Sequence, residues 1–129
     1  MTTATVPTDR TYLSLPINPE EGFPQSFRLA YAGHTYQVSL YVNIAEEVML
    51  TASDDTLFRL PAERAYLVMQ VARESSEGLQ ILFLRKLVTG IAYLAEELVF
   101  TFSAMTIAKR NLNGIGNFGS ILTGSVTIR

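Results

Sequence analysis

The chain has 129 residues, a formal net charge of −2 and no cysteine, and only 17% of its residues are charged. This length corresponds to about one domain and is enough to bury a hydrophobic core. The missing cysteine excludes disulfides, thiolate metal sites and cysteine nucleophiles, and it fits a reducing cytoplasm.

The charged residues are few and scattered. The two basic pairs, Arg85-Lys86 and Lys109-Arg110, are isolated, and we interpret them as strand-end or solvated charges, so we expect no nucleic-acid binding. A typical soluble domain has roughly 25% charged residues. The lower value here predicts that part of the surface is buried against other chains. Composition leaves one alternative open, namely a compact monomeric β domain with an uncharged surface.

The N-terminal region contains few structural signals. Residues 1–10 are rich in threonine and lack periodicity, so we expect a flexible N-terminal arm that orders on a partner. They carry no charged segment followed by an apolar one, so we expect no signal peptide. Residues 11–129 are then expected to form a single β domain. A first short strand follows at residues 12–15, and Pro16 and Pro19 confine it to a sheet edge or a strand start.

Residues 25–43 predict a tight β-hairpin. Apolar and polar side chains alternate with a period of two on both sides of Ala32-Gly33, and Gly33 supplies the positive φ of a short turn. The residues expected in the core are Phe27, Leu29, Val38 and Leu40.

The middle of the chain continues with short apolar segments. Residues 48–52 and 57–60 are predicted as strands, and residues 79–87 as a buried strand. Residues 62–74 fit either a helix that begins after Pro61 or a strand, because short apolar runs have no decisive period. We favour a strand here because the neighbouring segments are strands.

The last third alternates again. Residues 98–107 and 120–128 are predicted strands, and residues 111–119 a loop rich in glycine and asparagine. Residues 89–97 fit either a helical turn or an irregular crossing. About seven to nine short antiparallel strands at regular spacing predict a mostly β chain that folds as a single-domain β-sandwich or a small β-barrel. The longest apolar stretch, residues 98–108, is far shorter than the roughly 20 residues that span a bilayer, so we expect no membrane span.

No set of side chains predicts catalysis. His34 is the single histidine and follows the hairpin turn, which indicates a surface residue. Residues 114–119 spell G-x-G-x-x-G, but a strand rather than a helix follows, so we expect no dinucleotide there. Four acidic pairs are interpreted as solvated turn charges: Glu20-Glu21, Glu46-Glu47, Asp54-Asp55 and Glu96-Glu97. We therefore expect no enzyme activity, no metal and no cofactor.

Four residues are candidates for contact with partners. Residues 111–128 carry no charge, and Leu112, Ile115 and Phe118 are the large apolar residues of their loop. Glycines in the same loop allow a neighbouring chain to approach closely. Tyr41 shares a strand face with polar residues, and an exposed tyrosine is typical of an interface.

The hairpin also carries a resemblance. Its proline-bearing start, Q-x-F strand, G-x-x-Y turn and Y-x-N ending resemble the small baseplate plug proteins of tailed phages, known from cyanophage baseplates. The matching residues are Gln25, Phe27, Gly33, Tyr36, Tyr41 and Asn43. Phe118-Gly119 followed by a strand is similar to the end of the family. After Asn43 the chain departs from the pattern, with Val48-Met49-Leu50 where the family usually has an aromatic residue.

The resemblance implies a structural protein of a contractile tail. Such a protein is a plug inside the baseplate hub: it closes the lumen of the tail tube and contacts the hub, the spike or the tape-measure protein, together with other copies of itself. It would be located in the virion after assembly in the host cytoplasm. Two alternatives remain: another hub or tube-initiator ring subunit of a tail, and a small ligand-binding β-barrel with a cavity lined by aromatic residues.

Overall fold

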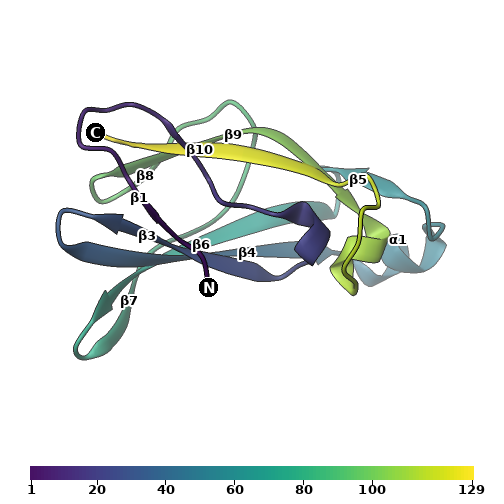
Figure 1. Ribbon diagram of the computed structural model, residues 1–129. Helices are drawn as coiled ribbons and strands as arrows, with labels where there is room; N and C mark the ends of the chain where they lie inside the picture. Colours follow the sequence, from purple (N-terminus) through teal and green to yellow (C-terminus); the bar gives the residue numbers. More distant parts are fainter.

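The computed structural model describes residues 1–129 as a β-sandwich of two five-stranded sheets (Figure 1). The first sheet has the order β1 (Thr3–Thr5), β3 (Gln25–Tyr31), β4 (His34–Ile44), β6 (Ala65–Ser75) and β7 (Gly78–Lys86). The second has the order β2 (Leu13–Ser14), β10 (Ile121–Ile128), β9 (Leu98–Ala108) and β5 (Leu57–Arg59), and β8 (Tyr93–Ala95) also pairs with β9.

The mostly β sandwich predicted from the sequence is confirmed. Both sheets end in edge strands, so the sandwich alternative holds and the closed barrel does not. The structure has ten strands rather than seven to nine, and β1 pairs with β3 in parallel while the other pairs are antiparallel. Three short helices, η1 (Pro19–Glu21), α1 (Glu46–Thr51) and η2 (Lys109–Leu112), lie in the connections.

The β3–β4 hairpin forms as predicted. Tyr31 pairs with His34, and the two residues between them, Ala32 and Gly33, have φ values of 51° and 79°. Two consecutive residues with positive φ make the tight turn whose twist matches that of the two strands. Glycine adopts this conformation without the steric cost of a Cβ atom.

The core lies between the sheets. The inward side chains of both sheets form one cluster of 24 buried residues. Tyr36, Val38 and Leu40 of β4 contribute to it, and so do Phe100 and Phe102 of β9. The four predicted hairpin core residues, Phe27, Leu29, Val38 and Leu40, are all buried.

The N-terminal residues differ from the prediction of a flexible arm over residues 1–10. Thr3–Thr5 form β1, the Thr2 carbonyl accepts a hydrogen bond from the Arg28 N–H at 2.8 Å, and Val6 is buried in the core. The outer edge of β3 offers unpaired backbone groups, and β-prone threonines satisfy them. These residues are therefore part of the first sheet.

The segment after β4 also differs. Residues 48–52 were predicted as a strand, but α1 covers Glu46–Thr51. Glu46 and Glu47 occupy its first turn, where the helix dipole favours negative charge. Val48 and Met49 are neighbours along the helix and pack against the core, which imitates a short apolar strand in the sequence. Residues 62–74 proved to be mainly strand, because β6 begins at Ala65.

Strand β7 was predicted correctly in place but not in burial. It lies at the edge of the first sheet, and most of its side chains are exposed or half-buried. In Figure 1 the tip of the hairpin of β6 and β7 projects away from the second sheet. A continuous apolar segment was interpreted as a strand covered on both faces, but in this fold only one edge and one face of β7 are covered.

The hairpin core gives a first prediction. Replacing the fully buried Leu40 by alanine leaves a cavity, and we expect the free energy of unfolding to fall by about 2–5 kcal/mol. Chemical denaturation monitored by circular dichroism measures the change. Asn43→Ala, an exposed position on the same strand, is the control and should change stability little. A loss below about 0.5 kcal/mol for Leu40→Ala would contradict the packing described here.

Candidate functional site

A cluster of titratable side chains, of which Tyr36 is buried and Arg73 and Glu97 are partly exposed, joins the two sheets. The Tyr36 hydroxyl of β4 donates a hydrogen bond to the Glu97 carboxylate, which lies in the turn between β8 and β9. The Arg73 guanidinium of β6 lies 3.9 Å from the same carboxylate and 5.6 Å from the centre of the Tyr36 ring. The cluster therefore links both sheets through one carboxylate.

Burial and the Glu97 carboxylate raise the pKa of Tyr36 to about 12. Burial alone would raise the pKa of Glu97, but the hydrogen bond from Tyr36 and the charge of Arg73 lower it below its ordinary value. Tyr36 has no exposed surface and cannot touch a substrate. The cluster is thus a structural link between the sheets.

The exposed histidine lies next to this cluster. His34 is at the hairpin turn, as predicted, and its ring centre is 6.4 Å from that of Tyr36. No group of three or more His, Asp or Glu side chains is close enough to hold a metal ion. No helix combines the length and the apolar composition needed to cross a bilayer.

An apolar groove of about 280 Å³, here named the end groove, lies at one end of the sandwich. Phe23 and Pro24 precede β3, Tyr41 belongs to β4, Met49 to α1 and Leu112 to η2, and all five line it. Two predicted contact residues, Tyr41 and Leu112, are therefore brought together although they are far apart in the sequence. Tyr41 is 40% exposed, and Leu112 packs partly against the core.

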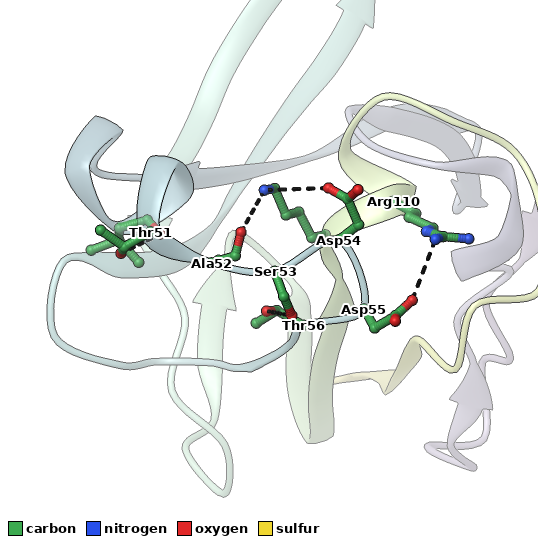
Figure 2. Close-up of polar contacts among 9 residues, drawn as sticks. Thr51, Ala52, Ser53, Asp54, Asp55, Thr56 and Arg110 are labelled. Carbon is green, nitrogen blue, oxygen red and sulfur yellow. Dashed lines mark hydrogen bonds and ion pairs between the residues drawn. The ribbon is translucent and has the colours of Figure 1, made fainter.

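Paired charges fix the wall beside this groove (Figure 2). The Lys109 ammonium donates to the Ala52 carbonyl at 2.8 Å and lies 3.8 Å from Asp54, while Arg110 pairs with Asp55 at 3.3 Å. The sequence suggested isolated, solvated charges, but the fold brings an acidic and a basic pair together. Because both aspartates are highly exposed, each ion pair contributes little stability. Their effect is to hold residues 52–56 against η2.

Asn111 organises the glycine-rich loop. Its side-chain amide donates to the carbonyls of Gly114 at 3.3 Å and Gly116 at 3.1 Å, and its side-chain oxygen accepts from the Ser120 hydroxyl at 2.6 Å. Asn111 is completely buried, and its own carbonyl accepts from the Phe23 N–H at 3.0 Å. The loop is thereby attached to the end groove rather than extended freely into solvent.

The other two predicted contact residues separate. Phe118 is half-buried, and its ring lies 5.7 Å from the Arg110 guanidinium. The ring also packs against Gly116: a Cβ atom on Gly116 would lie 2.8 Å from the Phe118 ring. Phe118 lines a depression that shares Met49 with the end groove. Ile115 points away and is 81% exposed.

A second apolar surface, at the edge strand β7, was not predicted from the sequence. Leu79, Ile81 and Leu84 of β7 are 54–58% exposed, and Ile91 and Leu94 are about half exposed. Of these five residues, Leu84, Ile91 and Leu94 line a groove of about 510 Å³. We name the exposed side chains Leu79, Ile81, Leu84, Ile91 and Leu94 the edge patch. The segment looked like a buried strand because its apolar run is uninterrupted. The one available signal was the Arg85-Lys86 pair that ends the run.

Comparison with protein-family models, with curated proteins and with solved structures finds no match for this chain. The residues at the two surfaces are therefore interpreted from their chemistry and from the hairpin resemblance.

Removing the Asn111 side chain should loosen the end groove. We expect Asn111→Ala to lower the free energy of unfolding by about 1–3 kcal/mol, because buried carbonyls and a hydroxyl lose their partner. It should also speed hydrogen exchange at residues 113–119, measured by mass spectrometry. Asn113→Ala, an exposed neighbour, is the control. Equal exchange in the variant and the wild type would refute the anchoring role.

The Tyr36 cluster predicts a pH dependence. A folded pKa of about 12 lies above the ordinary value of 10.0, so the folded protein holds this proton more tightly than the unfolded chain. The stabilising contribution is complete below pH 10 and is lost as the pH rises toward 12. Urea denaturation at several pH values should show this loss in the wild type and a smaller one in Tyr36→Phe. The same slope in both proteins would contradict the assignment.

Proposed function

We propose that this chain is a structural subunit of a multi-protein assembly, and specifically a plug of the baseplate hub in a contractile phage tail. The observation that carries the general proposal is the edge patch, where large aliphatic side chains face solvent on a chain with few charges. An exposed apolar patch of this kind typically marks a surface that another protein covers.

The energetics favour a partner. Burying a fully exposed leucine or isoleucine contributes about 1.5–3 kcal/mol, so covering a half-exposed set of them favours association substantially. Leu79, Ile81 and Leu84 lie close together on one strand. A single contact can therefore remove the unfavourable free energy of exposing these side chains to water. Interfaces in lasting assemblies have a core depleted in charge, which fits the composition of β7 between its ends.

The residues that carry the baseplate plug resemblance divide into two groups. Gly33, Phe27 and Tyr36 serve the turn and the core. The Gln25 amide donates to the carbonyls of Asn18 and Gly22, each at 2.9 Å, and so holds the loop before β3.

Tyr41 and Asn43 form the second group. Both are exposed on β4, and the core does not require them. Tyr41 lines the end groove, which makes it the resemblance residue best placed to contact a tail protein. A hub, a spike or the end of a tape-measure protein is the partner that the resemblance implies.

Two alternatives keep some support. The apolar surfaces fit another hub or tube-initiator ring subunit equally well. The end groove is the surface that a small ligand would use, and at about 280 Å³ it lies just below the roughly 300–1,000 Å³ usual for ligand pockets. The aromatic residues that would line a barrel cavity, such as Phe100 and Phe102, instead fill the core.

The decisive experiment is to locate the chain in tailed particles from its source. Antibodies against the chain should label the baseplate end of the tail in immunogold electron microscopy, and mass spectrometry of purified tails should detect it. Labelling along the tube or tail tip would favour a different tail component. Particles free of the chain would contradict the proposal.

A variant of the end groove tests the surface itself. Tyr41→Asp places a charge in an apolar contact, so we expect at least a tenfold lower amount of the chain in particles while the isolated protein keeps its thermal stability. Quantitative mass spectrometry of particles measures incorporation. His34→Ala is the matched control on the same strand and should be incorporated normally. Normal incorporation of Tyr41→Asp would exclude the end groove as a contact.

A further inference from the structure

The free edges of the two sheets are very unequal. Strands β1, β5 and β8 have three residues each and β2 has two, whereas β7 has nine. A free edge exposes unpaired N–H and C=O groups that can pair with another strand, and short edges limit this. The long edge of β7 is therefore the place where a further strand can bind.

The free side of β7 can be assigned from one hydrogen bond. The Leu87 N–H donates to the Leu67 carbonyl of the segment that forms β6, at 2.8 Å. Backbone groups of an antiparallel strand point alternately toward its two neighbours. The N–H groups of Leu84 and Lys86 are therefore directed away from β6, toward the open edge.

The exposed leucines and isoleucine of β7 share one face. Leu84, Ile81 and Leu79 stand opposite Gln70, Ala72 and Glu74 of β6, which are alternate residues of that strand. The register shifts between Val71 and Ala72 because β7 has one extra residue there, which forms a β-bulge. The bulge places Leu84 on the same face as Ile81 and Leu79, although Leu84 and Ile81 are three residues apart. An added strand would extend this apolar face.

The charges at the ends of β7 are opposite. Glu77 precedes the strand, Arg85 and Lys86 end it, and residues 78–84 carry no charge. If a second β7 runs antiparallel with Leu79 opposite Leu84, Glu77 of one strand lies opposite Lys86 of the other. The two-fold axis produces each of these pairs twice. A parallel arrangement would instead place the basic ends together, where like charges repel.

We propose that β7 binds β7 of a second copy of this chain in this antiparallel register, so that the first sheets of two molecules join into one. This inference rests on the proposed function as an assembly subunit and names one of its partners. The contact would satisfy the open edge and bring Leu79 of each molecule beside Leu84 of the other on one continuous apolar face.

The self-complementary charges allow a sharp test on the full chain. Sedimentation equilibrium should show a dimer for the wild type. Glu77→Lys and Lys86→Glu should each weaken it about 2- to 30-fold, because two symmetric cross-strand pairs become repulsive. The double variant E77K/K86E should restore most of the wild-type affinity, since the pairs are rebuilt with reversed sign. Failure of the double variant to recover affinity would overturn the proposed register.

A second variant tests the apolar part. Ile81→Lys should give a monomer, while Leu50→Lys, the same kind of change at the exposed Leu50 of α1, should leave the dimer intact. Both positions face solvent in the isolated chain, and circular dichroism checks that both variants fold. A wild type that stays monomeric up to the highest concentration at which it is soluble, or a dimer insensitive to Ile81→Lys, would overturn the proposal.

The outcome is independent of the particle experiment. A monomeric chain found at the baseplate would refute β7 pairing and leave the proposed function standing. A β7 dimer missing from tailed particles would refute the proposed function and leave the pairing standing.

Discussion

The contact between the inward faces of the two sheets is the constraint on which the rest of the molecule depends. Neither sheet can bury its apolar face alone, and together they form one cluster of 24 buried residues. Packing within the second sheet is also close: a Cβ at Gly124 of β10 would lie 2.8 Å from the ring of Phe102 on the neighbouring strand β9. The Tyr36–Glu97 hydrogen bond adds a polar link between the layers at the same place where Arg73 neutralises the carboxylate. The end groove and the edge patch lie at the margins of this core.

The ends of the sandwich are ordered by polar groups rather than by apolar packing alone. Buried Asn111 satisfies carbonyl groups of its loop, and Lys109 satisfies the Ala52 carbonyl after α1. Buried backbone groups without partners are costly, so these side chains determine where the loops can lie. The end groove is therefore a surface of fixed shape. The edge patch differs in this respect. The unpaired backbone N–H and C=O groups at the free edge of β7 can pair only with a strand of another chain.

The candidate contact residues were partly predictable. Residues 111–128 attract attention because they lack charge, and Tyr41 because an aromatic stands among polar residues. Their meeting in one groove depends on β4, α1 and η2 converging, which no local pattern records. Ile115 and Phe118 share a loop in the sequence but point to different surroundings, since the Asn111 hydrogen bonds decide the course of the loop. The edge patch could not be predicted from β7, because an apolar run looks the same in a central strand and at an edge.

The sequence by itself determined the elements whose signals are local. Alternation with a period of two and the positive φ at Gly33 specify the β3–β4 hairpin, and the same alternation identifies β9 and β10. The tertiary structure alone decided what depends on neighbours far along the chain: that residues 3–5 pair with β3, that residues 46–51 turn into a helix, and that β7 lies at an edge. The physical reason is that side-chain period and turn chemistry act over a few residues, whereas strand order and burial follow from which surfaces meet when the whole core closes.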